Sequence, residues 1–285
     1  MGDLTAGGTR MNAPRRLMND ESENIPTAWT ADSKALLFLS DRNGAWGIFK
    51  QGINQETADP MFTGTEDAGY PHMSADGVWI LFLEHSGTRR ARVGPRRLMR
   101  IPAGGGVPQF VMETLNSTSI RCSRTPSTLC IIAEVSQDQK QLVITGFDPV
   151  RGRGKILRTI DNDVSLDSRV RLSPDGSVLA MTRNVDPEVR IRLLSLAGAA
   201  DREITLKGWP DGGGINWSPD GKGFYYGSSS AGGCTLLYVD LKGNARVLWQ
   251  KKGSYQTWGI PSPDGRHLAI LGGVVSSNAW MLEGF

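Results

Sequence analysis

The sequence predicts an all-β fold, a six-bladed β-propeller made of four-stranded antiparallel blades. The turn Ser-Pro-Asp-Gly stands at 173–176, 218–221 and 262–265, and looser copies stand at 30–33, 74–77 and 123–126. Measured from the residue before each turn, successive copies lie 44, 49, 50, 45 and 44 residues apart. A period in the forties is typical of repeat architectures, in which each unit buries its apolar face against its neighbours.

Each repeat has the pattern of four short strands, which we call A to D. The turn joins A to B, because proline presets φ for a turn and glycine accepts a positive φ. A five-residue apolar run such as 36–40 follows each turn and is typical of a buried strand B. More alternating segments such as 235–241 predict strand C, and segments such as 245–251 predict strand D. No long segment has a helical apolar stripe, so we expect almost no helix, and four-stranded units of this period form propeller blades.

The repeats place one propeller domain at residues 14–285, after a flexible segment at 1–13. The individual repeats span about 24–64, 68–114, 117–161, 168–207, 213–251 and 257–285. The sixth repeat ends within its strand C, whereas residues 14–20 resemble a spare strand D. We therefore expect residues 14–20 to pair with residues 279–285 and close the ring, since an open ring exposes an unpaired edge. The alternative is that residues 14–20 end a blade that lies upstream.

The composition indicates a globular chain, with 39% hydrophobic and 21% charged residues among 285. A net charge of +3 argues against nucleic-acid binding by this domain. The apolar runs are too short to insert into a membrane, and residues 1–16 lack the apolar stretch of a signal peptide. The compartment stays open: extracytoplasmic if the chain belongs to a membrane-anchored receptor, and cytoplasmic otherwise. We expect a monomeric ring.

Two of the three cysteines, Cys122 and Cys130, fall in predicted strands A and B of the third repeat. A short hairpin could bring them together as a disulfide, which would argue for an oxidising compartment. The two positions align with Trp29 and Tyr225 of other repeats, and this alignment favours two buried thiols instead.

The sequence offers little for catalysis. It contains no G-x-S-x-G elbow, no H-E-x-x-H, no C-x-x-C and no phosphate-binding loop. Two of its three histidines, His72 and His267, fall in or beside predicted strands, where we expect a structural role. We therefore predict a protein that is not an enzyme and needs no cofactor.

Alternating carboxylates at Asp161, Asp163 and Asp167 are weak candidates for a metal site. Carboxylates at this spacing can bind calcium when a glycine-turned loop supplies further oxygens. The glycine and the final glutamate of such a loop are missing here. We favour a solvated loop and predict no metal.

The best marked binding candidate is an arginine-rich insertion at 88–100, in the B–C connection of the second repeat. Guanidinium groups at Arg89, Arg90 and Arg92 could bind a carboxylate, a phosphate or an acidic protein surface. The alternative is a solvated loop. B–C and D–A loops share one face of a propeller, and the further candidates on that face are Tyr70, Arg169 and Trp258, each near the start of an inner strand. We expect a protein partner or a small anionic ligand there.

The repeated turn and the apolar strand after it resemble the WD40-like, TolB-type propeller repeat, over essentially the whole chain from residue 14. Residues 121–134, 138–157 and 277–285 further resemble C-terminal propellers of bacterial, especially acidobacterial, regulators that carry a Ser/Thr kinase or winged-helix domain. The resemblance implies a non-catalytic binding or sensing module of a larger bacterial signalling protein, or a TolB-like interaction protein. The alternative is a substrate-gating or accessory propeller of a peptidase or hydrolase.

Overall fold

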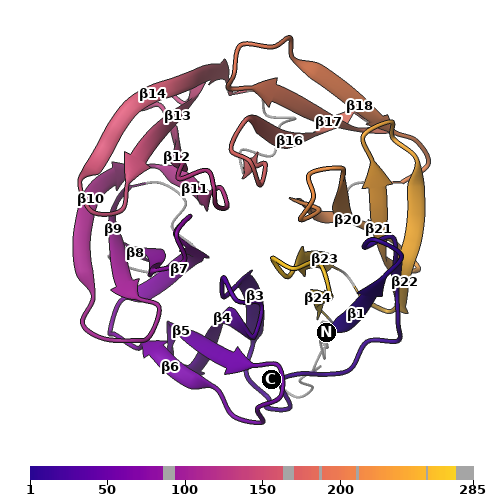
Figure 1. Cartoon of the computed structure of the whole chain (residues 1–285), viewed down its shortest axis with the longest axis horizontal. Coiled ribbons are helices and arrows are strands. Elements are labelled where there is room, and N and C mark those ends of the chain that lie inside the picture. Colours follow the sequence, from indigo (N-terminus) through magenta and orange to yellow (C-terminus); the bar gives the residue numbers. More distant parts are fainter. Residues whose placement is uncertain (86–93, 163–169, 186–187, 210–211, 255, 274–285) are drawn as a thin grey trace, which may run out of the picture.

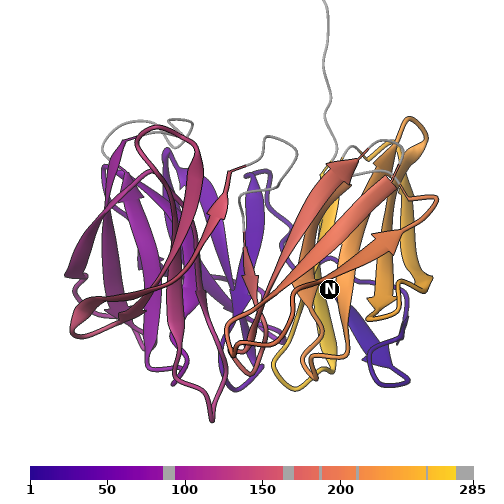
Figure 2. The same ribbon diagram turned by 90° about the horizontal axis from the view of Figure 1, so that it is seen from above.

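Six four-stranded sheets surround a central axis in the computed structural model (Figure 1). The structure describes residues 1–85, 94–162, 170–185, 188–209, 212–254 and 256–273. From the side, the blades stand next to one another as steep, twisted sheets (Figure 2). The described residues form no helix, so none belongs to one long and apolar enough to cross a membrane. The predicted six-bladed propeller is confirmed.

Strand A of every blade is the innermost, and strands B, C and D follow outward. Blade 1 comprises β3 (Asn24–Trp29), β4 (Ala35–Asn43), β5 (Ala45–Gly52) and β6 (Asp59–Phe62). Blade 2 comprises β7 (Asp67–Met73), β8 (Trp79–His85), β9 (Pro95–Pro102) and β10 (Gln109–Leu115). Blade 3 comprises β11 (Ser117–Cys122), β12 (Cys130–Val135), β13 (Gln141–Asp148) and β14 (Gly152–Asp161).

The second half of the ring repeats this order. Blade 4 comprises β15 (Arg171–Leu172), β16 (Val178–Val185), β17 (Glu188–Ser195) and β18 (Arg202–Leu206). Blade 5 comprises β19 (Gly212–Trp217), β20 (Gly223–Ser230), β21 (Gly233–Asp240) and β22 (Ala245–Lys252). Blade 6 combines β23 (Gln256–Pro261) and β24 (His267–Gly273) with β1 (Gly2–Thr5) and β2 (Arg10–Met11) from the other end of the chain.

The A–B hairpins owe their shape to the repeated turn. In blade 5, the Ser218 hydroxyl donates to Asp220 Oδ1 at 2.7 Å, and the amide of Lys222 donates to the same oxygen at 3.1 Å. The glycine that follows, Gly221, has a φ of 69°. The equivalent Ser–Asp bond recurs in blades 2, 4 and 6, so in these blades the turn fixes where strand A ends.

The apolar core lies between neighbouring blades. One cluster joins blades 4 and 5, where Trp217 packs against Phe224 with their ring centroids 4.3 Å apart. Equivalent clusters lie between the two blades of each remaining adjacent pair, including blades 6 and 1. Each sheet thus buries both faces against its neighbours, as expected when a unit is too thin to form a core alone.

The ring is closed by N-terminal strands, but not by the residues that the sequence favoured. Strand β1 pairs with β24 through Gly2 opposite Leu268 and Asp3 opposite His267, and β2 pairs with β1. The segment at 1–13 is therefore largely part of blade 6 rather than a free end. Residues 14–20 form no strand. Leu17 and Met18 pack onto the apolar cluster between blades 6 and 1. Their expected partner, 279–285, lies outside the described residues.

The expectation of two buried thiols is wrong. Cys122 and Cys130 stand opposite each other in the last pair of the β11–β12 ladder and form a disulfide. The short hairpin brings the two strands directly together at this point, and the bond closes the base of the loop at 123–129. Cys234 is buried and free.

Candidate functional site

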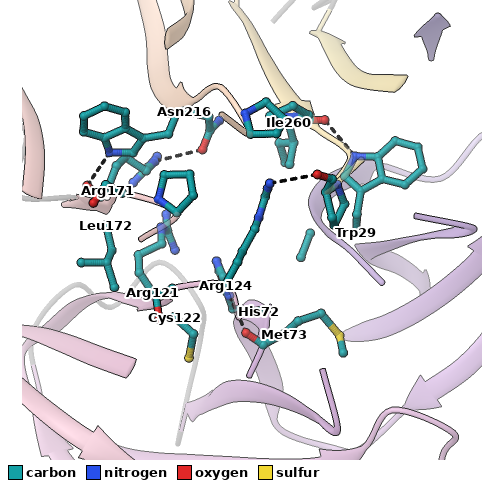
Figure 3. Close-up of a pocket in the computed structure, with 18 of the residues that line it drawn as sticks. Trp29, His72, Met73, Arg121, Cys122, Arg124, Arg171, Leu172, Asn216 and Ile260 are labelled. Atoms are coloured by element: carbon teal, nitrogen blue, oxygen red, sulfur yellow. Dashed lines mark hydrogen bonds between the residues drawn. The ribbon is translucent and has the colours of Figure 1, made fainter. Parts of the chain in front are cut away.

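The central channel holds a cavity of about 830 Å³. Its wall consists of the innermost strand of each blade and the A–B hairpins that follow (Figure 3). A volume of this order is typical of ligand pockets, which span roughly 300–1,000 Å³.

Six equivalent positions, one in each repeat, form a ring around the cavity. Each stands two residues before the serine or threonine of the turn. In blade order these residues are Ala28, His72, Arg121, Arg171, Asn216 and Ile260. The ring is chemically asymmetric, because blades 2 to 5 contribute polar or cationic side chains, whereas blades 6 and 1 contribute apolar ones.

A second ring lies one residue after the turn serine or threonine, where most repeats have alanine or proline. In blade order it consists of Ala31, Ala75, Arg124, Pro174, Pro219 and Pro263. Arg124 is the exception, and its side chain crosses the channel (Figure 3). Its Nη1 donates to the carbonyl oxygen of Pro263 at 3.4 Å, so blade 3 reaches the opposite blade 6. Burial lowers the pKa of Arg124 from its ordinary value.

Arg171 is held by its neighbours. Its Nε donates to the Ile215 carbonyl at 2.7 Å and to Asn216 Oδ1 at 3.2 Å. The Asn216 amide in turn donates to the Gly259 carbonyl at 2.9 Å, and the indole of Trp217 donates to the Arg171 carbonyl at 3.0 Å. These bonds run through blades 4, 5 and 6 and fix the guanidinium at the channel wall. The acceptors of the two Arg171 bonds are a main-chain carbonyl oxygen and the Asn216 amide oxygen.

His72 is neutral at physiological pH. Burial lowers the pKa of its imidazole to about 3, and the positive charge of Arg121 contributes, followed by those of Arg124 and Arg171. Its Nδ1–H donates to the Met73 carbonyl at 2.8 Å. All three guanidinium groups thus contribute to the lowered pKa of His72.

Cationic groups outnumber anionic ones among the described lining residues. Four arginines line the cavity, namely the three above and Arg202, against Asp175 and Asp220. Each aspartate is engaged within its own hairpin, where Asp175 accepts from Ser173 and Ser177 and Asp220 accepts from Ser218. Hydrogen bonds hold the pKa of Asp175 below its ordinary value although burial opposes them. Among the described residues, the lining of the cavity thus carries more positive than negative side chains.

Two of the sequence-predicted residues, Tyr70 and Trp258, line this cavity. Both stand two residues before members of the first ring, Tyr70 on blade 2 before His72 and Trp258 on blade 6 before Ile260. Tyr70 lies where the β7–β8 pairing shifts register, with a φ of 53°. Such a bulge redirects a side chain.

The remaining candidates give no site in the described part of the chain. Arg89, Arg90, Arg92 and Arg169 lie outside the described residues, as do Asp163 and Asp167. Asp161 ends β14. No three His, Cys, Asp or Glu side chains of the described residues gather as a metal site would require.

Sequence reasoning missed the arginines of strand A because it examined the loops. The repeat alignment itself contains the signal: one column of an otherwise apolar strand holds His72, Arg121, Arg171 and Asn216. A polar side chain at a fixed position of the innermost strand points to the channel. Arg124, in a column of alanine and proline, is the second deviation.

The fold and the cavity together define a propeller with a ligand-sized central channel. No model of a known protein family matches the sequence, and no curated protein matches it. Solved structures do. TolB from Acinetobacter baumannii superposes with a TM-score of 0.68 and 16% identity, over 88% of this chain and 63% of that one. A putative TolB from Agrobacterium tumefaciens superposes with a TM-score of 0.66 and 18% identity, over 96% and 98% of the two chains.

A gluconolactonase from Xanthomonas campestris is also similar, with a TM-score of 0.63 and 17% identity over 95% of this chain and 91% of that one. At such identities the likeness concerns the fold. The chain has a propeller fold of the TolB type, and it spans 63% of the length of the Acinetobacter protein. An enzyme and TolB proteins thus share this architecture, so the site must decide the function.

Proposed function

We propose that this protein is a non-catalytic binding propeller that holds a segment of a partner protein in its central channel. The observation that carries the proposal is the chemistry of the channel wall. Its arginines stay charged, its histidine is held neutral by a pKa of about 3, and its two aspartates are engaged in their own hairpins. Groups fixed in one protonation state suit recognition better than proton transfer, since a general base works best with a pKa near the operating pH.

The disulfide between Cys122 and Cys130 extends the proposal to the compartment. Disulfides persist in oxidising surroundings and are rare in the bacterial cytoplasm. We place the ring outside the cytoplasm, as an interaction protein or as the sensing part of a larger bacterial signalling protein.

Selection from a library of displayed random peptides tests the channel as the binding site. Ala75 lines the cavity at the hairpin of blade 2, where three of the six repeats have proline. An Ala75→Trp variant should narrow the channel and reduce the binding of selected peptides by about tenfold or more. Val107 is 79% exposed and does not line the cavity, so Val107→Trp serves as the matched control and should bind as the parent does.

The outcomes separate this site from the loop face. If the selected peptides bind Ala75→Trp as tightly as the parent but lose binding when Arg89, Arg90 and Arg92 are changed to Ser, the site is the arginine-rich insertion. If no peptide depends on either change, the binding proposal is wrong.

The gluconolactonase fold neighbour supplies the second candidate, an enzyme. We expect no turnover of gluconolactone by the purified chain. Turnover that Ala75→Trp abolishes and Val107→Trp preserves would replace the binding proposal with a catalytic one.

A further inference from the structure

We propose that the open edge of β24 (residues 269–273) binds a partner protein, which adds an extended segment to blade 6 as an antiparallel strand. An acidic side chain of this segment lies beside Lys251 of blade 5. The site belongs to the outer part of the ring and goes beyond the proposed function, because it does not depend on what the central channel binds.

Blade 6 has less strand pairing than the other blades. In blades 1 to 5, strand B pairs with strand C through six to eight residue pairs. In blade 6, β24 pairs with β1 only at His267 and Leu268, next to the A–B hairpin. No strand of the described residues pairs with the rest of that edge. The N-terminal strands thus complete blade 6 beside its hairpin and leave the edge open further along β24.

The residues along the open edge are correspondingly accessible. Residues 223–228, in strand B of blade 5, are all buried. In β24 burial ends at Ala269, and Ile270, Leu271 and Gly272 are half-buried. A short edge with a lysine beside it does not invite general aggregation. It suits a partner strand that matches it.

The main chain of β24 presents hydrogen-bonding groups to the open side at alternate residues. The amide of Ser262 donates to the His267 carbonyl at 2.8 Å, so His267 turns its main-chain groups toward β23. Alternation along the antiparallel pair also turns those of Leu271 toward β23, and those of Ile270 and Gly272 away from it. Only an extended backbone has donors and acceptors at this two-residue spacing, so the occupant is a polypeptide strand.

Strand β22 of blade 5 favours an acidic side chain in that segment. A Cβ on Gly272 would lie 3.0 Å from the Trp249 ring and 3.6 Å from Lys251 Nζ. Nζ donates to the Gly272 carbonyl at 3.4 Å, near the limit of a hydrogen bond. None of the ion pairs between described residues includes Lys251. Directly opposed residues share a face about 4.5–5.5 Å apart, so a carboxylate opposite Gly272 comes close to this ammonium.

The position two residues further along the partner strand favours an apolar side chain. It stands opposite Ile270, on the same face as the acidic residue. Ile270 packs with Leu248 and Trp249 on the cluster between blades 5 and 6. An apolar partner side chain would extend this cluster. The expected segment therefore has an acidic residue followed, two positions later, by an apolar one.

The probe is the blocked peptide acetyl-Thr-Val-Glu-Val-Ile-Thr-amide, with glutamate for the place opposite Gly272 and isoleucine for the place opposite Ile270. Amide hydrogen exchange of the full chain, followed by NMR, reports on the edge. Without peptide, the amides of Ile270 and Gly272 should exchange faster than that of Leu271, which points to β23. Saturating peptide should slow both by about tenfold or more.

Two peptide twins and two variants test the contacts. A peptide N-methylated at its isoleucine cannot donate to the Ile270 carbonyl and should give no protection. A twin with glutamine for glutamate should bind about threefold more weakly. Lys251→Gln should abolish this preference for glutamate. Lys252→Gln is the matched control and should keep it, because the next residue of a strand points to the opposite face.

Protection of Ile270 and Gly272 as strong as that of Leu271 without peptide would overturn the inference. Such protection at every protein concentration would mean that the chain fills its own edge, and protection that rises with concentration would assign the edge to a second copy. Unchanged exchange at millimolar peptide, equal protection by the N-methylated twin, or a glutamate preference that survives Lys251→Gln would overturn it as well.

Discussion

At the residue scale, the glycines of the A–B hairpins have similar positive φ angles but different neighbours. Gly221 and Gly77 have φ of 69° and 73°. A Cβ on Gly221 would have no neighbour within 4 Å, whereas one on Gly77 would lie 2.6 Å from the Cβ of Ala31 in the adjacent blade. Left-handed backbone costs an L-residue about 1–2 kcal/mol.

We therefore expect Gly221→Ala to reduce the free energy of unfolding by about 1–2 kcal/mol, through backbone strain alone. Gly77→Ala should cost clearly more, since the two blades must also move apart. Urea denaturation of both variants measures the difference. Equal losses would show that the contact between blades 1 and 2 does not hold Gly77 in place.

His72 gives a pH dependence whose sign follows from its pKa. The imidazole has a pKa of about 3 in the folded protein, against about 6.5 when unfolded. Between about pH 6.5 and 3, His72 is protonated in the unfolded chain but neutral in the folded one. The contribution of His72 to the free energy of unfolding is therefore fully present above about pH 6.5 and is lost as the pH falls toward 3. Arg121, Arg124 and Arg171 oppose protonation in the fold.

His72→Asn should remove this dependence while keeping a donor near the Met73 carbonyl. Between pH 6.5 and 5 the parent should lose about 2 kcal/mol more than the variant. Thermal melts of the parent and the variant at both pH values measure these losses of stability. Carboxylates that titrate in both proteins contribute equally and cancel when the two losses are compared. Parallel losses would mean that His72 is accessible to protons in the folded ring.

At the element scale, the hairpin of blade 3 is held by a disulfide bond in place of the hydrogen bonds to a turn aspartate that hold the other hairpins. Its turn sequence, Ser-Arg-Thr-Pro, lacks the aspartate found in the other five blades and the glycine found in four of them, and the disulfide joins residues eight apart instead. Closing so short a loop stabilises by about 2–3 kcal/mol in the chain-entropy account. The bond also fixes the base of the loop that presents Arg124 to the channel.

Dithiothreitol should therefore lower the melting temperature of the parent by several degrees. A Cys122→Ala/Cys130→Ala variant should melt near the reduced parent and should not respond to the reductant. The buried thiol of Cys234 is common to both proteins and cancels. A parent that melts alike with and without reductant would exclude a stabilising role for the bond.

Strands that are bounded by a recognisable turn could be predicted from the sequence. Strands that form only because they pair with a distant part of the chain could not. The repeated turn locates strands A and B because Ser218, Asp220 and Gly221 determine the hairpin among themselves. Strand β1 has four residues, and β2 has two, with glycines between them; their pairing depends on β24, more than 250 residues away. Residues 14–20 have a better apolar pattern, but they form no strand.

The candidate site shows the same limit. Tyr70 and Trp258 could be found from their place at the start of inner strands, and the structure brings both to the cavity. The reach of Arg124 across to Pro263 could not be found, because it requires the ring to place blade 3 opposite blade 6. Distances across a channel depend on closure of the whole ring and leave no local pattern.

At the scale of the whole molecule, the N-terminus holds the two ends of the ring together. Leu4 and Met11 pack on the cluster between blades 5 and 6, beside Tyr225. The amide of Leu4 donates to the Arg266 carbonyl at 2.7 Å, and the Tyr225 hydroxyl donates to the Gly8 carbonyl at 3.1 Å. Figure 1 shows β1 against β24, so the first residues of the chain complete the last blade.

Deletion of residues 1–11 should therefore open the ring. The variant loses the apolar burial of Leu4 and Met11, worth roughly 2–4 kcal/mol, and exposes the edge of β24 to pairing with other chains. We expect a lower melting temperature and concentration-dependent aggregation, measured by calorimetry and light scattering. A synthetic peptide of residues 1–13 should restore the melting temperature when added in trans. The same peptide with Leu4→Asp should not, because it keeps the strand but cannot bury its side chain. A deletion variant that melts with the parent and stays monomeric would show that another part of the chain closes the ring.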